Sequence, residues 1–215
     1  MAEAVIFDMD GVLIDSEPLH YRTDTEMLAK LGISEGPDYL NRFVGTSNPE
    51  MWRAILDEHG IDREIDGILN AQLSLKLKLL KAEEWKPIDG IPELFRALRK
   101  YGVPIAVASS SSAIFIKEAL KRIRLLDFVD AYVSGESVEH GKPEPDVFLR
   151  AAEMIGAEPR DCVVVEDSRN GVLAAKRAGM RCVGFQNPKS GDQDLSAASL
   201  VVDSFVGLSI ATLFG

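Results

Sequence analysis

The sequence predicts an α/β protein, built on a doubly wound parallel sheet that is interrupted by one all-helical insertion. From residue 91 onward, short apolar runs alternate with amphipathic stretches, which is typical of a parallel sheet with helices on both faces. Residues 15–86 carry helical periodicity and no strand-like run. An apolar run at residues 4–7 ends abruptly in acidic residues, as expected where a buried strand meets a ligand at its carboxyl end.

Composition excludes several classes of function. The 215 residues are 46% hydrophobic, enough for one larger domain with a small insertion, and the formal net charge of −10 without a Lys/Arg cluster argues against nucleic-acid binding. No apolar run approaches the ~20 residues of a membrane span, and no basic signal-peptide region opens the chain. Cys162 and Cys182 lie in apolar runs as small core residues. We therefore expect a cytoplasmic protein, monomeric or weakly self-associating, with neither nucleic-acid nor membrane partners.

The insertion is predicted to be a helical cap over residues 15–86, which divides the remainder into a core of residues 1–14 and 87–215. Ser16 is a candidate N-cap for its first helix, Glu17 and Pro18 suit the first turn, and Gly32 suits the stop. Apolar residues at helical spacing predict cap helices over 17–31, 49–59 and 62–81.

In the core, helices and strands are predicted in strict alternation after the insertion. The predicted helices cover 91–101, 112–124, 144–155 and 170–178, the predicted strands cover 103–109, 131–133, 162–165, 182–185 and 200–202, and a short helix closes the chain. This order predicts the parallel sheet.

Two carboxylates directly follow the opening strand. Because successive side chains alternate in extended chain, Asp8 and Asp10 project to the same side, and two like charges at that spacing repel unless a cation lies between them or one carries a proton. Mg²⁺, which takes oxygen ligands and keeps several waters, suits such a pair. Gly11 would let the backbone approach a ligand closely.

Three later strands end in polar residues of a kind that would complete a phosphoryl-transfer site around Asp8. Ser109 and Ser110 offer hydroxyl and N–H donors after the second strand. Lys142, between a glycine and a proline, is a fixed positive charge near a helix start. Glu166 and Asp167 terminate a fully apolar strand, where unpaired carboxylates are costly unless they share a metal ion.

The string from Phe7 to Pro18, Phe-Asp-Met-Asp-Gly-Val-Leu-Ile-Asp-Ser-Glu-Pro, resembles the first signature of the haloacid dehalogenase-like hydrolases. The later Ser, Lys and Glu-Asp motifs resemble the other three signatures in the same order. The likeness is to the branch with a helical cap, similar to β-phosphoglucomutase and phosphoglycolate phosphatase. It implies a Rossmann-like catalytic core and a phosphoric monoester hydrolase.

The resemblance also implies a role for each motif. Asp8 would be the nucleophile that forms an aspartyl-phosphate, and Asp10 the general acid and base, with burial beneath the closed cap favouring its protonated form. The later motifs would hold phosphate and metal: Ser109, Ser110 and Lys142 bind the transferring phosphate, and Mg²⁺ binds Asp8, the Asp10 carbonyl and Asp167, assisted by Glu166. A small phosphorylated metabolite, such as a sugar phosphate, is the expected substrate.

Three alternatives stay open. Dehalogenases of this superfamily lack the second aspartate of the first motif, so Asp10 favours phosphate chemistry. A mutase similar to β-phosphoglucomutase would have an arginine after the cap motif Gly45-Thr46-Ser47, where this chain has Asn48. A non-catalytic phosphate-binding module on the same scaffold is the third reading, since fold alone does not guarantee activity.

The cap is expected to select the substrate. His20 lies one helical turn past the loop that carries Asp8 and Asp10, so it is the candidate cap residue nearest to these two aspartates. The full set of candidates is Glu17, His20, Asn48, Trp52, Lys76 and Lys78.

Overall fold

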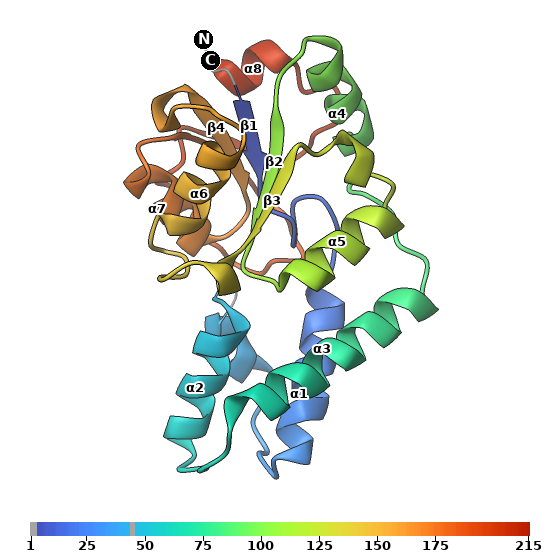
Figure 1. Cartoon of the computed structure of the whole chain (residues 1–215), viewed down its shortest axis with the longest axis vertical. Helices are drawn as coiled ribbons and strands as arrows, with labels where there is room; N and C mark the ends of the chain where they lie inside the picture. Colours follow the sequence, from blue (N-terminus) through green and yellow to red (C-terminus); the bar gives the residue numbers. More distant parts are fainter. Residues whose placement is uncertain (1–3, 44–45) are drawn as a thin grey trace.

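The computed structural model describes residues 4–43 and 46–215, and Figure 1 shows a sheet-based core with a helical cap below it. The core is built on a six-stranded sheet in the order β3-β2-β1-β4-β5-β6, and every pair in it is parallel. The strands are β1 (Ala4–Phe7), β2 (Ile105–Ser109), β3 (Ala131–Ser134), β4 (Cys162–Glu166), β5 (Arg181–Phe185) and β6 (Leu200–Val202). The predicted α/β class is confirmed.

Helices cover both faces of this sheet because its strands are apolar on both sides. Alternate residues of β1 join different clusters: Val5 and Phe7 pack on one face, Ala4 and Ile6 on the other. The first face is covered by α4 (Ile91–Lys100), α5 (Ala113–Arg122) and α8 (Ile210–Phe214), and the second by α6 (Asp146–Met154) and α7 (Arg169–Arg177).

The cap has a small hydrophobic core of its own. It consists of α1 (Glu17–Lys30), the 3₁₀ segment η1 (Pro37–Phe43), α2 (Asn48–Glu58) and α3 (Ile65–Ala82), all between β1 and β2. Trp52 is fully buried at its centre, packed with Met27, Leu28 and Ile55. The cap helices therefore form one packed unit below the sheet (Figure 1).

The two connections between cap and core run side by side. Ile14 forms an antiparallel bridge with Pro87, and the Ile88 N–H donates to the Leu13 carbonyl at 3.0 Å. The start of the cap is also tied to a core loop, since Lys189 Nζ lies 2.5 Å from a carboxylate oxygen of Asp15. The cap is thus attached at one narrow hinge.

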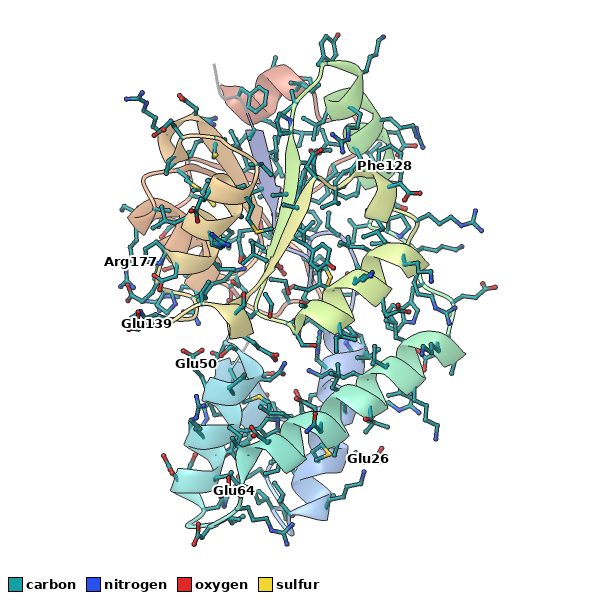
Figure 2. All side chains as sticks on the ribbon, viewed as in Figure 1. Glu26, Glu50, Glu64, Phe128, Glu139 and Arg177 are labelled. Atoms are coloured by element: carbon teal, nitrogen blue, oxygen red, sulfur yellow. The ribbon has the colours of Figure 1, made fainter. Side chains whose placement is uncertain are left out.

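The predicted helices and strands all occur, with bounds shifted by up to three residues. Charged side chains such as Glu26, Glu64 and Arg177 lie on the outside (Figure 2), and no helix in the described part of the chain is long and apolar enough to span a membrane. Cys162 and Cys182 are buried and unpaired, as predicted. Ser16 is the N-cap residue of α1, as predicted, but its hydroxyl makes no capping bond to the helix and donates to Asp10 instead.

We expect Gly90→Ala to lower the free energy of unfolding by about 1–3 kcal/mol more than the left-handed backbone conformation alone would cost an alanine. Gly90 has φ +87°, and a Cβ there would lie 2.4 Å from the Phe205 carbonyl carbon. Gly102→Ala is the matched control, because Gly102 has φ +68° and open space around it, so that variant carries only the left-handed backbone cost of about 1–2 kcal/mol. Urea unfolding measures both, and equal losses of stability would contradict the steric argument.

Candidate active site

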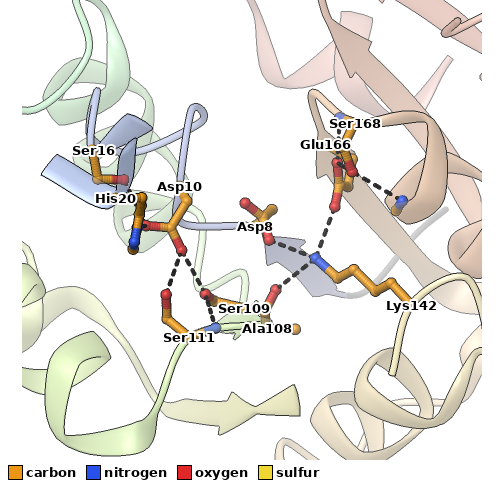
Figure 3. A network of polar contacts seen from close by, with 11 residues as sticks. Asp8, Asp10, Ser16, His20, Ala108, Ser109, Ser111, Lys142, Glu166 and Ser168 are labelled. Carbon is orange, nitrogen blue, oxygen red and sulfur yellow. Dashed lines mark hydrogen bonds and ion pairs between the residues drawn. The ribbon is translucent and has the colours of Figure 1, made fainter. Parts of the chain in front are cut away.

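Polar side chains from three neighbouring strands converge at the carboxyl edge of the sheet. Asp8 follows β1 and extends its ladder, since its N–H donates to the Val165 carbonyl of β4 at 2.9 Å. Ser109 ends β2, and Glu166 ends β4. Because β1 lies between β2 and β4, motifs far apart in the sequence meet around Asp8 (Figure 3).

A buried lysine joins two of these strand ends. Lys142 Nζ lies 2.5 Å from Asp8 Oδ1 and 2.7 Å from Glu166 Oε1, and it donates to the Ala108 carbonyl at 3.2 Å. Only 4% of Lys142 and 5% of Asp8 are exposed to solvent. Burial alone would lower the pKa of Lys142, but the two carboxylates raise it, so the ammonium stays charged.

The acidic members of the site lack sufficient positive charge. Burial raises the pKa of Asp8 well above its ordinary value, with further increases from Glu166 and Asp10 that Lys142 opposes. Burial likewise raises the pKa of Asp167, with further increases from Glu166 and Asp8. A carboxylate must be ionised to act as a nucleophile or a metal ligand, and a further cation beside Asp8 and Asp167 would favour the ionised form of both.

The donor set fits Mg²⁺. Within residues 4–43 and 46–215, no group of three or more His, Cys, Asp or Glu side chains forms a ready-made metal cage. Mg²⁺ does not need one, since it commonly binds one or two carboxylates and completes its shell with waters and substrate phosphate. Asp8 and Asp167 provide two carboxylates whose raised pKa values a divalent cation would reverse.

Asp10 lies in a different electrostatic environment from Asp8. Its Oδ1 accepts from Ser16 Oγ at 2.5 Å and lies 2.8 Å from His20 Nε2. Its Oδ2 accepts from the hydroxyls of Ser109 at 2.8 Å and Ser111 at 3.0 Å. The carboxylate therefore has partners on the core and on the first cap helix (Figure 3).

These partners overturn the expected effect of burial on Asp10. Burial does raise its pKa, but His20 and the hydrogen bonds from Ser16 and Ser109 outweigh burial and hold the pKa of Asp10 well below its usual range. The expectation that burial keeps this group protonated is wrong, because four donors stabilise the ionised form. A proton available at this position belongs to the Asp10–His20 pair.

Glu166 and Asp167 are held by different neighbours. Glu166 Oε1 bonds Lys142, and its Oε2 accepts from the N–H and hydroxyl of Ser168 at 2.7 and 3.0 Å. Asp167 accepts from the Ser190 hydroxyl. Both oxygens of Glu166 already have protein donors, so it is placed to position Lys142, whereas Asp167 is the better placed to offer a ligand oxygen.

A cleft of about 110 Å³ lies between cap and core above these residues. Asp8, Asp10, Ser110, Ser111 and Asp167 line its core side, and Glu17, His20, Asp24, Asn48 and Lys76 are among the residues of its cap side. Burial raises the pKa of Glu17, although His20 lowers it.

Of the six candidate cap residues, four line the cleft and two do not. Trp52 is absent from the lining because it fills the hydrophobic core of the cap. Lys78 is absent because it lies on an exposed part of α3. Gly45 of the cap motif lies outside the described residues.

The structure also brings in polar residues that sequence analysis did not assign. Ser111 shares Asp10 with Ser109, and its position in the serine run at 109–112 was the only available signal. Ser109 itself is fully buried, and its hydroxyl donates to Asp10 where a direct phosphate contact was predicted. Asp24 and Ser190 had no signal, because one falls within a helical pattern and the other in a loop.

A parallel α/β core with a lysine-bridged pair of carboxylates beneath a helical cap defines a class of capped α/β hydrolases. Residues 2–179 match the family model described as haloacid dehalogenase-like hydrolase. The chain belongs to this family, in its branch similar to β-phosphoglucomutase and phosphoglycolate phosphatase.

Individual relatives agree with this assignment. Hexitol phosphatase B of Escherichia coli strain K12 is 32% identical over 99% of this chain and 96% of its own length. A phosphorylated carbohydrates phosphatase of Thermotoga maritima is 33% identical over 83% of this chain and 82% of its own length. The solved structure of β-phosphoglucomutase from Clostridium difficile superposes with a TM-score of 0.87 at 26% identity, covering 98% of this chain and 95% of that one. The predicted enzyme class, a phosphatase-type hydrolase, is confirmed.

We expect Lys142→Met to lower the free energy of unfolding by about 3–5 kcal/mol, because it leaves two carboxylates buried without their cation. Lys189→Met is the control, since its pairing with Asp15 lies at the surface, with 59% of the lysine side chain exposed, and contributes about 0–1 kcal/mol. Urea unfolding without added metal makes the comparison. Equal stability of the two variants would contradict a buried ionic centre.

Proposed function

We infer that this protein is a Mg²⁺-dependent phosphatase of small phosphorylated metabolites, sugar or polyol phosphates in particular, that acts through an aspartyl-phosphate on Asp8. The observation that carries the inference is the buried Asp8 carboxylate at the base of the cleft, held by Lys142 and flanked by a second acid with its own proton partner. The positions of these groups suit the two halves of a phosphoryl transfer.

In the first half, Asp8 attacks phosphorus as the ester oxygen leaves. A carboxylate and a phosphate dianion repel each other, so positive charge must lie beside both. Lys142 supplies it from the Asp8 side, and Ser110 lies at the cleft for contact with phosphate oxygens. Ser109 can turn its hydroxyl from Asp10 toward phosphate once Asp10 moves to the leaving oxygen.

Mg²⁺ would be held by Asp8, the Asp10 carbonyl and Asp167, with Glu166 assisting through Lys142. When bound, it supplies charge neutralisation for the transferring phosphate and keeps both carboxylates ionised.

Proton transfer falls to Asp10 with His20. The leaving alkoxide takes a proton from this pair, the P–O bond to the substrate breaks, and the alcohol departs. In the second half, water attacks the phosphorus of the aspartyl-phosphate, returns a proton to the pair and releases inorganic phosphate and free Asp8. His20 Nε2 lies 2.8 Å from Asp10 Oδ1, so a proton can pass between the two groups on its way to or from the reacting oxygen.

The charge of the cleft favours hydrolysis over mutase chemistry. A mutase must hold a bisphosphorylated intermediate, which calls for strong positive charge at the far end of its site. Among the described residues that line the cleft there is no arginine, Lys76 is the sole lysine, and Asn48 stands where the mutase pattern has arginine. The names of the relatives from E. coli and T. maritima point the same way, to carbohydrate-type phosphates.

We expect Asp8→Asn to lower phosphate release from a hexitol phosphate by at least about 10³-fold, because the nucleophile is lost. Asp127→Asn, at an exposed acid distant from the site, is the matched control and should retain full activity. Released phosphate is measured with Mg²⁺ and again after chelation with EDTA, which should reduce wild-type activity to background.

Three results would contradict this function. Equal phosphate release by Asp8→Asn and the wild type would exclude the nucleophile. Sugar-phosphate isomer conversion without phosphate release, in a coupled assay, would establish a mutase. A wild type that binds phosphate esters but releases no phosphate from any of them would be a binding module.

His20→Gln tests the proton pathway. Glutamine can still donate a hydrogen bond to Asp10 but cannot transfer a proton, so kcat for a hexitol phosphate should fall by about 10²-fold. The rate at which the first turnover releases 4-nitrophenolate should change little, because 4-nitrophenolate leaves without protonation and the pair accepts a proton from water only in the second half. Equal losses for both substrates would show that His20 only maintains the structure.

A further inference from the structure

A second cavity lies beside the active-site cleft, on the far side of Asn48 and Lys76. It measures about 260 Å³ and opens between cap helix α3 and core helix α5. Asn48, Lys76 and Ser111 line both spaces, so the two cavities are neighbours that share one wall. Nothing in the chemistry of phosphate transfer derived above uses this second space.

The shared wall is a chain of polar contacts that crosses from cap to core. Lys76 Nζ, only 3% of whose residue is exposed, donates to Asn48 Oδ1 at 3.0 Å. Asn48 Nδ2 in turn donates to Glu136 Oε1 at 3.0 Å. The Lys76 ammonium is therefore already hydrogen-bonded to the Asn48 carboxamide, which in turn donates to the Glu136 carboxylate of the core.

The start of α2 also lies close to the same core loop. A Cβ at Gly141 would come within 2.4 Å of Glu50 Oε2, and Figure 2 shows Glu50 beside the loop that carries Glu139. The wall is thus part of the contact that holds the cap closed, and not a loose surface feature.

The second cavity suits a neutral, hydroxyl-rich group. Asn70, Gln72 and Ser112 add carboxamides and a hydroxyl, and Leu69, Leu73 and Phe115 add apolar surface against which C–H groups can pack. Asp66 and Glu136 are acids, and Lys76 is the sole base among the described residues that line it. This lining offers hydrogen-bond acceptors to hydroxyls and opposes a second anion.

We propose that this cavity is a subsite for the end of the substrate remote from the phosphate, and that it selects an uncharged polyhydroxylated chain over one that ends in an anionic group. The proposal rests on the proposed phosphatase function and deepens it. Glu136 is the specificity-determining residue, because it places a carboxylate where a terminal carboxylate or phosphate of the substrate would lie. Asn48 and Lys76 position it by holding the wall together.

The test compares two substrates that differ only at the far end. Glucitol 6-phosphate ends in a neutral hydroxymethyl group, and 6-phosphogluconate ends in a carboxylate on the same six-carbon chain. With the wild-type protein and Mg²⁺, kcat/KM should be at least tenfold higher for glucitol 6-phosphate. The Glu136→Gln variant should raise kcat/KM for 6-phosphogluconate and so narrow the ratio between the two substrates severalfold. Glu139→Gln is the control, because Glu139 is an exposed acid of the same loop that lines neither cavity, and it should leave the ratio unchanged.

A filling variant tests the location. Asn70→Trp should raise KM for glucitol 6-phosphate at least fivefold and leave KM for the three-carbon glycerol 3-phosphate as it is, since the shorter chain does not reach the second cavity. Lys78→Trp, on an exposed part of α3 that lines neither space, is the matched control. Equal effects of Asn70→Trp on both substrates would overturn the placement.

The preference for glucitol 6-phosphate over 6-phosphogluconate can also be measured as binding, without turnover. Calorimetric titration of Asp8→Asn should give a Kd at least tenfold lower for glucitol 6-phosphate than for 6-phosphogluconate. A wild type that shows this ranking in binding but hydrolyses neither compound would overturn the phosphatase function and keep the subsite. Similar affinities, tighter binding of 6-phosphogluconate, or binding of neither compound would overturn the subsite, whatever the catalytic result.

Discussion

The contact on which the rest of the site depends is the buried ammonium of Lys142 between Asp8 and Glu166. It joins residues 134 positions apart in the chain, and it lies at the edge where β1 meets β4. Burial makes each carboxylate unfavourable by itself, so the lysine fixes the relative positions of the strand ends as well as their charge. The same centre holds two carboxylates whose pKa values burial raises, so the proposed divalent cation would stabilise their ionised forms.

Two aspartates separated by one residue acquire opposite properties from their neighbours. Asp8 has a raised pKa and a single buried cation, whereas Asp10 has a lowered pKa and four side-chain contacts. This division suits a nucleophile that needs a cation to be ionised and a proton carrier that works together with a histidine. His20 belongs to the cap, so in the proposed mechanism the docked cap contributes a group that shares the proton of Asp10.

The core and the cap divide the work of recognition. In the proposed mechanism the core residues of the cleft touch the phosphate, and Glu17, Asn48 and Lys76, which line the cleft from the cap helices, would contact the remainder of the substrate. The single hinge at Ile14 and Pro87 allows the two parts to be built independently. In such an arrangement the reaction type depends on the strand ends and the choice of substrate on the inserted helices.

The sequence by itself determined the parallel α/β core, the helical insertion and the strand-end motifs, because burial periodicity and abrupt acidic strand ends are local properties. It also offered six candidate cap residues, but it could not show which of them line the cleft. Glu17, His20, Asn48 and Lys76 do, whereas Trp52 fills the cap core and Lys78 faces solvent. Only the tertiary structure decided that Ser16 and Ser109 serve Asp10, that Glu166 holds Lys142, and that a second cavity adjoins the cleft. The second cavity depends on the way in which the cap docks on the core, and the partners that decide the pKa of a side chain come from distant segments whose distances no local pattern encodes.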